Sequence, residues 1–389
     1  MSASFAIQRT PRVAVSAFFL AAGAGIGAWA ASLPALSARA DLDKGELGIV
    51  LLCFALGAIA TMTSVGRILP RYGTAAICLL SAVVFGGVLI AVPHSGNMAL
   101  LAVLVFVGGG GFGALDVAMN TEASFLERQS GRHIMSSFHA VFSVGSLAGA
   151  GICGQLLRMG GDLALCLGVA GAAAIALALI ARFWSDLPEE PDDAQVSATS
   201  DPRLGGAQKR HLWLLGGVAF LALFTEGALM DWSAIYLVGT VGASESTGAF
   251  GFAVFAATMA IGRAVGDMIM RVLGPALALR LGAGLVAGSL AFALTFSNVP
   301  VVFAALALCG IGIANVVPAI FSAAGRIGGD AAGAAMSRVT TMGYAGLLVG
   351  PPFIGFLAEG TTLAASLFAV VVAAVIVAAG ASLVSVRGK

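Results

Sequence analysis

The chain has 389 residues, and 59% of them are hydrophobic before its 53 glycines are counted. Charged residues make up 10% and the net charge is +1, whereas a soluble domain carries about 25% charged residues. A soluble globule cannot cover itself with so few charges, so most of this chain must face lipid. The composition excludes a soluble enzyme, a disordered tail and a nucleic-acid-binding protein, and we expect no nucleic acid among its partners.

Twelve apolar stretches are long enough to cross the hydrocarbon core of a bilayer, which takes about 20 residues in a helix. Their length and lack of alternation exclude β-barrel strands, so the sequence predicts an all-α membrane protein with twelve transmembrane helices. The first stretch continues through the cleavage-like Ala28-Trp29-Ala30, and we expect it to be a helix rather than a removed signal peptide. The predicted helices are 12–36, 46–68, 74–93, 98–122, 134–158, 162–184, 211–238, 247–271, 275–296, 299–323, 334–358 and 361–386.

The positive charges predict how the chain is oriented. With the N-terminus in the cytoplasm, all but three of the 20 Lys and Arg residues lie at or near the cytoplasmic side. The exceptions are Arg39, Lys44 and Arg158. This bias follows the positive-inside rule, so we expect both chain ends in the cytoplasm. The excess of arginine over lysine is typical of a GC-rich bacterial genome, so we expect the protein in the inner (plasma) membrane of a bacterium.

The two halves of the chain are copies of each other. Residues 185–210 are rich in Pro, Asp, Ser and Gly and predict a flexible cytoplasmic linker between six-helix bundles at 1–184 and 211–389. A shift of 200 or 201 residues aligns the bundles with the same orientation, which predicts a parallel repeat about an axis along the membrane normal. Matched pairs include Gly27 and Gly227, Gly48 and Gly248, Gly66 and Gly266, Gly145 and Gly346, and Gly149 and Gly350.

Two motifs carry a resemblance to a known family. The segment from Gly66 to Gly73 resembles the loop signature G-x-L-x-D-R-x-G of the major facilitator superfamily, with Pro70 in place of the acid. The stretch GALDVAMN, from Gly113 to Asn120, resembles the acid-then-Asn stretch of that superfamily's fucose:proton symporter branch. The resemblance implies the fold of this superfamily and transport of a sugar-like solute by alternating access, with a substrate site near the midplane between the halves.

Ionisable side chains inside a membrane span are costly and therefore mark functional candidates. Asp116 and Asn120 lie one turn apart on one face of a helix that lines the cavity in this fold. We expect Asp116 to carry a proton or to accept a hydrogen bond from solute, the alternative being an ion-paired or packing carboxylate. His139 lies at a similar depth in the next helix, where it is either a relay partner of Asp116 or a hydrogen-bonded core histidine.

The second bundle supplies three further candidates. Glu226, near the middle of the seventh helix, is the second predicted proton site. Asp231 is turned about 140° from it, so the two face different surroundings. Asn315, close to Pro318, binds substrate hydroxyls or else pairs with backbone that the proline leaves unbonded.

Charged residues near the cytoplasmic ends predict gates. Arg338 pairs across the halves, binds an anionic substrate, or extends its side chain to the interface. Two further groups predict latches that hold the inside closed, unless they are stable ion pairs at helix ends. These latches are Arg263 with Asp267, and Glu122 with Arg67 or Arg71.

Taken together, these patterns favour a secondary active transporter. The sequence has no nucleotide-binding G-x-x-x-x-G-K-[ST] loop, so the intramembrane carboxylates make protons the expected coupling ion. A proton-driven drug or metabolite efflux pump is the alternative. We expect no enzyme activity, no cofactor and no metal, and five cysteines without metal-clip spacing or a disulfide role. The expected partners are a small-molecule substrate and the lipid bilayer, and we expect the monomer to function.

Overall fold

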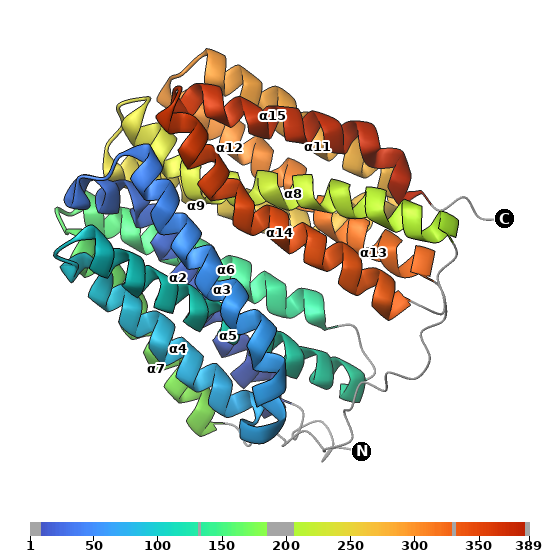
Figure 1. Cartoon of the computed structure of the whole chain (residues 1–389), viewed down its shortest axis with the longest axis horizontal. Coiled ribbons are helices and arrows are strands. Elements are labelled where there is room, and N and C mark those ends of the chain that lie inside the picture. Colours follow the sequence, from blue (N-terminus) through green and yellow to red (C-terminus); the bar gives the residue numbers. More distant parts are fainter. Residues whose placement is uncertain (1–8, 131–133, 185–205, 329–331, 386–389) are drawn as a thin grey trace. The chain divides into compact units, whose positions relative to one another are not determined.

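The computed structural model describes residues 9–130, 134–184, 206–328 and 332–385, and these residues form helices throughout (Figure 1). Up to Trp184 the elements are α2 (Arg9–Ala40), α3 (Lys44–Tyr72), α4 (Thr74–Ala91), η1 (Val92–His94), α5 (Met98–Ser130), α6 (Met135–Arg158) and α7 (Leu163–Trp184). After it they are α8 (Gly206–Gly239), α9 (Glu245–Ala264), α10 (Gly266–Leu273), α11 (Pro275–Thr295), α12 (Val299–Ile313), α13 (Val316–Gly328), α14 (Ala332–Glu359), α15 (Leu363–Ala379) and η3 (Gly380–Val384).

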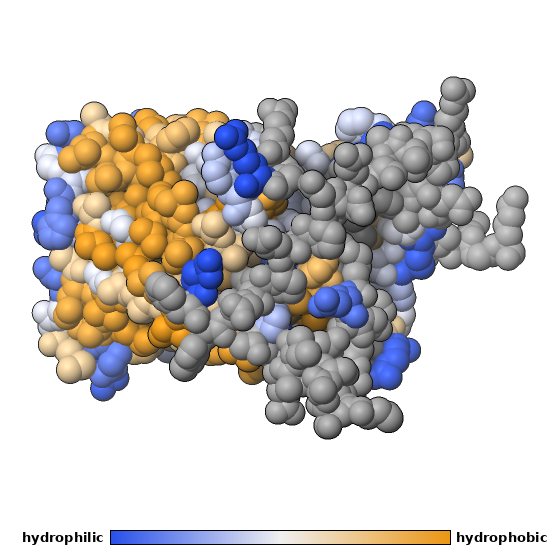
Figure 2. Space-filling model, turned by 90° about the horizontal axis from the view of Figure 1, so that it is seen from below, coloured by the Kyte–Doolittle hydropathy of each residue, from blue (hydrophilic) through white to orange (hydrophobic). Residues whose placement is uncertain are grey.

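Within the described residues, 12 helical spans are long and apolar enough to cross a membrane, which confirms the predicted fold class and span count. Hydrophobic residues cover much of the face shown in Figure 2, with hydrophilic residues along its left-hand edge. Helix α2 continues without interruption past Ala30 to Ala40. The last five residues of the predicted linker, 206–210, belong to α8, and residues 185–205 lie outside the described residues.

Two predicted helices are each interrupted in the structure. The stretch 299–323 is divided into α12 and α13 by a turn at Ala314 and Asn315. Pro318 explains this turn, because a proline has no N–H and its ring would clash with the carbonyl of residue 314 in a continuous helix. The stretch 247–271 is divided into α9 and α10 at Val265. Helix α5 is longer than predicted and continues eight residues past position 122, to Ser130.

Contacts divide the chain into two compact units. Unit 1 contains the described residues of 1–42, 49–196 and 245–253, and unit 2 contains those of 43–48, 197–244 and 254–389. Residues 43–48 therefore group with unit 2 and residues 245–253 with unit 1, while the bundle boundaries at 1–184 and 211–389 remain predictions.

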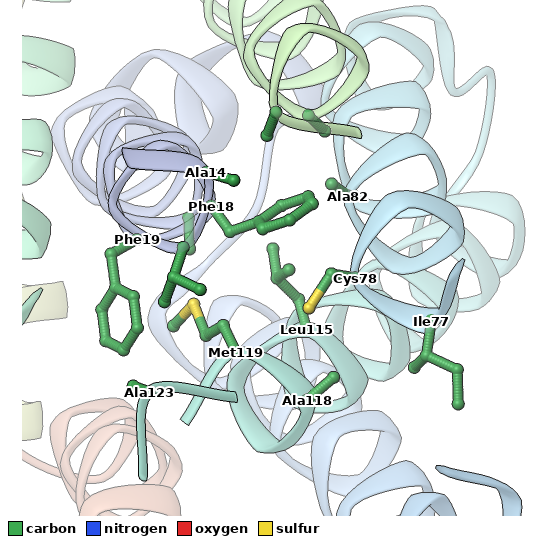
Figure 3. Close-up of a cluster of buried hydrophobic side chains, with 14 of the residues drawn as sticks. Ala14, Phe18, Phe19, Ile77, Cys78, Ala82, Leu115, Ala118, Met119 and Ala123 are labelled. Atoms are coloured by element: carbon green, nitrogen blue, oxygen red, sulfur yellow. The ribbon is translucent and has the colours of Figure 1, made fainter. Parts of the chain in front are cut away.

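The core of unit 1 forms where α2, α4 and α5 meet (Figure 3). Phe18 of α2, Cys78 of α4 and Leu115 of α5 are each no more than 1% exposed and pack in one hydrophobic cluster. A corresponding cluster in unit 2 joins α8, α11, α13 and α14, with Leu212, Ile320 and Val339 fully buried. These clusters fix the helices from which the polar candidates project.

Glycines repeat the same close helix contact in both units. A Cβ atom added to Gly145 of α6 would meet the backbone carbonyl of Leu20 in α2, closer than real Cβ atoms approach. At the repeat-related Gly346 of α14, it would meet the carbonyl of Phe220 in α8. The next turn repeats the arrangement with Gly149 on Ala24 and Gly350 on Phe224. Each pair keeps the register of 200 or 201 residues that the sequence predicts, so small residues here allow close helix approach in both copies.

Gly346→Ala should destabilise the protein, because the added methyl group forces α14 away from the carbonyl of Phe220. Overpacking of this kind costs about 1–3 kcal/mol. Gly288→Ala is the matched control, since a Cβ there meets nothing within 4 Å. Thermal unfolding in detergent should show a lower midpoint for Gly346→Ala and an unchanged or higher midpoint for Gly288→Ala. Equal midpoints for the two variants would contradict the close contact.

Candidate functional site

Asp116 and Asn120 lie together on α5, as the sequence predicts. The amide Nδ2 of Asn120 donates to the Oδ1 atom of Asp116 at 3.2 Å and to the backbone carbonyl of Asp116 at 2.8 Å. The neighbouring Leu115 and Met119 point into the core of unit 1 (Figure 3). Asp116 and Asn120 are half-buried. A helix turns about 100° per residue, so the core-facing residues place the pair at the edge of the packed face. The carboxylate is therefore oriented by Asn120 without being sealed in.

Glu122 of α5 is one of the predicted latch residues, and its side chain is buried against the start of α4. It is 2% exposed, and the hydroxyl of Thr74, the first residue of α4, donates to its Oε2 atom. A carboxylate at a helix N-terminus is stabilised by the partial positive charge of the helix end. The side chain of Arg67 lies outside the described residues, and the guanidinium of Arg71 lies 5.5 Å from the centre of the Tyr72 ring. The latch between Glu122 and these arginines remains a prediction.

The His139 ring packs against an aromatic ring of α2. Its centroid lies 5.4 Å from that of Phe19, with the ring planes at 74°. Two residues earlier on α6, the Ser137 hydroxyl accepts a hydrogen bond from Arg12 at 3.1 Å. These contacts tie α6 to α2, and the proposed relay from His139 to Asp116 remains a prediction.

Unit 2 contains an ion pair that sequence analysis did not predict. The Nη2 atom of Arg263, near the end of α9, lies 3.0 Å from the Oε1 atom of Glu226 in α8. The Glu226 side chain is 10% exposed and that of Arg263 is 27% exposed, so the pair is largely removed from solvent. Such a carboxylate is stabilised by the guanidinium that it contacts, and removing either partner leaves a buried charge. The side chain of Asp267, predicted as the partner of Arg263, lies outside the described residues.

The side chain of Asn315 forms a hydrogen bond with the backbone near the break between α9 and α10. Its Nδ2 atom donates to the carbonyl of Gly262 at 2.8 Å. A Cβ atom added to Gly266, at the start of α10, would collide with the Asn315 carboxamide. Asn315 therefore fills the space between the ends of α9 and α10. This contact is of the backbone-pairing kind that the sequence left open, although the carbonyl belongs to α9 and not to the segment before Pro318.

The side chains of Asp231 and Arg338 in unit 2 have polar atoms without a hydrogen-bond partner among the described residues. Asp231 is half-buried in α8, and no described residue forms a hydrogen bond with its side chain. The next residue, Trp232, is fully buried and donates from Nε1 to the carbonyl of Pro351 at 2.9 Å. Arg338, in α14, has a buried Nη1 atom without a hydrogen-bond partner among the described residues.

Two contacts at these sites had little or no signal in the sequence. Glu226 and Arg263 are 37 residues apart, and the repeat gives no hint of their pairing because Glu226 matches Ile26. The adjacency of the seventh and eighth helices was the available signal, since consecutive helices usually lie side by side. Thr74 had no signal of its own, because a hydroxyl at a helix start is common whether or not it binds a carboxylate.

Arg263→Met should destabilise the protein because it leaves the Glu226 carboxylate buried without its cation. Breaking a buried pair in this way costs about 3–5 kcal/mol, and adding Glu226→Gln should restore most of the loss. Thermal unfolding of the two single variants and the double variant measures this, with Arg280→Met at an exposed position of α11 as the control. Additive losses in the double variant would show that the two side chains do not stabilise each other.

Gly266→Ala should also be destabilising, because its methyl group meets the Asn315 side chain. In an Asn315→Ala background the same substitution should cost less, since the obstructing carboxamide is gone. The coupling between contacting residues is about 0.5–3 kcal/mol, measured as the departure of the double variant from the sum of the singles. A coupling of zero would place the two residues apart.

Comparisons with known proteins agree with this architecture. The family model of the Major Facilitator Superfamily matches residues 13–324. An uncharacterised MFS-type transporter of Yersinia pestis is 34% identical over 372 residues, covering 95% of this chain and 94% of the relative. The membrane protein MosC of Rhizobium meliloti is 30% identical over 368 residues, covering 94% of this chain and 88% of the relative.

A solved structure shares the fold at low sequence identity. The bacterial homologue of the human lysosomal transporter Spinster, in an inward-facing and unoccupied conformation, superposes with a TM-score of 0.76 at 16% identity. The alignment covers 97% of each chain. The chain therefore belongs to the major facilitator superfamily and is a transporter of that type.

Proposed function

We propose that this chain is a secondary active transporter that moves a small polar solute by alternating access and is driven by protons. Its membership of the superfamily and the lack of a nucleotide-binding loop in its sequence support a gradient as the energy source. The arginine bias supports an inner-membrane location with both termini in the cytoplasm. We propose that the monomer is the working unit and that it needs no cofactor.

The pair of Glu226 and Arg263 is the observation that carries the proposal of proton coupling. An ionised carboxylate away from water is costly, and a guanidinium or a proton can each remove that cost. In the proposed cycle, Glu226 alternates between its pair with Arg263 and a state in which that pair is broken. On the described parts of α12 to α15, the charged residues are Arg326, Arg338 and Glu359, and none of them is a hydrogen-bond partner of Glu226.

Asp116 supports the solute side of the proposal. Its Oδ1 atom accepts from Asn120, and no hydrogen bond to its Oδ2 atom is found among the described residues. That oxygen is available for a hydroxyl of the solute or for a proton. The resemblance of Gly113 to Asn120 to the fucose:proton symporter branch favours a hydroxylated, sugar-like solute and uptake by symport. We propose this direction, with efflux as the opposite outcome of the transport assay.

Reconstituted protein tests the coupling directly. In proteoliposomes with an imposed proton gradient, wild type should accumulate a labelled solute found by a thermal-shift screen of sugars, acids and drugs. Glu226→Gln and Asp116→Asn should each lose gradient-driven accumulation by about tenfold or more, because neither amide takes up a proton. Solute counterflow, which needs no net proton movement, should survive in at least one of the two variants.

Asp162→Asn is the matched control for these variants. Asp162 lies at the turn before α7 and accepts from the backbone N–H of Leu165, a capping role that asparagine also fills. This variant should accumulate solute as wild type does. Accumulation that persists in both Glu226→Gln and Asp116→Asn contradicts proton coupling through these residues, and accumulation on the opposite side of the membrane identifies an efflux pump.

A further inference from the structure

The described arginines of the membrane spans differ in how their guanidinium groups are satisfied. Arg12 donates to Ser137, Arg39 to the carbonyl of Pro93, and Arg263 to Glu226. Arg326 donates to the Ser322 hydroxyl at 2.6 Å and to the carbonyl of Val384 at 3.2 Å. Other described arginines, including Arg158, Arg182 and Arg280, are exposed at or near helix ends. Arg338 fits neither group, because it is half-buried and its buried Nη1 atom has no partner in the described part of the chain.

The position of Arg338 in unit 2 puts a hydrophobic residue of α8 at the same level. Arg338 lies six residues after the start of α14, or about 9 Å along the helix axis. One turn later, the Met342 side chain packs at Gly216 of α8, which places Arg338 at the level of Leu212. Leu212 is fully buried in the hydrophobic cluster of unit 2 and offers no acceptor side chain.

The repeat shows which contact is missing. Position 338 matches Ser137, and position 212 matches Arg12. In unit 1 the guanidinium comes from α2 and the serine hydroxyl of α6 accepts its hydrogen bond. In unit 2 the guanidinium comes from α14, and the matching position of α8 is Leu212. Both units therefore have a guanidinium at this level, but only in unit 1 does the matched position of the neighbouring helix supply its acceptor.

We propose that Arg338 is an oxyanion-binding residue and that its Nη1 atom donates to a carboxylate or phosphate group of a ligand. A guanidinium presents a planar fork of donors that matches both groups, and it stays charged under all working conditions. Assigning this oxyanion to the transported solute rests on the proposed function and narrows the solute to an anion, such as a sugar acid. The binding site itself does not depend on transport.

Thermal unfolding in detergent tests the site without a gradient. The probes are inorganic phosphate and gluconate, each compared with chloride at equal ionic strength and, for gluconate, with the uncharged gluconamide. At least one of the two oxyanions should raise the wild-type midpoint by several degrees, whereas gluconamide and chloride should not. Arg338→Gln should remove this shift, and Arg338→Lys should keep a smaller one.

Arg326→Gln is the matched control, since that guanidinium is already bonded within unit 2 and should contribute nothing to oxyanion binding. Because Arg338→Gln removes a buried donor without a partner, its midpoint in chloride should not fall below that of wild type. This result also shows that the variant is folded.

A second arm distinguishes a free solute from a lipid headgroup as the source of the oxyanion. Wild type and Arg338→Gln are compared in nanodiscs of phosphatidylcholine and of phosphatidylglycerol. A phosphatidylglycerol-specific shift that needs Arg338 assigns the site to a headgroup, and a shift with the soluble probes assigns it to a solute. The proposal is overturned if no oxyanion, free or lipid, shifts the wild type, or if Arg338→Gln keeps the shift. If wild type shows the oxyanion shift but no proton-driven accumulation of solute, only the proposed function is overturned.

Discussion

Polar groups inside a membrane span must find their partners within the protein, and this constraint shapes each candidate site of the chain. Water is absent from the hydrocarbon core, so an unsatisfied group there costs several kcal/mol. Asn120 therefore bonds to Asp116, and the guanidinium of Arg263 pairs with the carboxylate of Glu226. Asn315 meets the same demand by bonding to backbone between α9 and α10. The Nη1 atom of Arg338 has no such partner among the described residues, which is why we propose a ligand for it.

The duplicated glycine contacts and the polar groups have opposite relations to the repeat. Gly145 and Gly346 keep equivalent carbonyl contacts in the two units, since close helix packing is needed equally by both copies. Glu226, by contrast, matches Ile26, and Asp116 matches an apolar valine of α13 under either shift. Each of these ionisable groups therefore occurs in one copy and not in the other. A transporter that handles a solute and an ion at separate groups needs this asymmetry, because identical copies would offer two identical sites.

The fold was predictable from sequence because it depends on properties that a single chain displays, namely the length of apolar runs and the spacing of glycines. The interruption at Asn315 does not follow from Pro318 alone, because a proline in a span is compatible with a kink, a break or a first helical turn. The contact of Asn120 with Asp116 was predictable because both lie on one helix and helical spacing fixes their relation. The contact of Arg263 with Glu226 was not, because it depends on how two helices are rotated against each other.

The candidate residues differ in whether their polar side-chain atoms are already bonded within the protein or are open to a ligand. The amide of Asn315 is held by the carbonyl of Gly262, and its carboxamide closes over Gly266, so binding a solute there would break a contact that fills a helix interruption. Asp116 is different, because Asn120 contacts its Oδ1 atom and leaves Oδ2 unbonded within the described structure. A residue that orients a carboxylate through one oxygen while leaving the second open reduces the entropy lost when a solute or a proton arrives. Asp116 is therefore better placed than Asn315 to bind a solute or a proton, whereas Asn315 stabilises the break between α9 and α10.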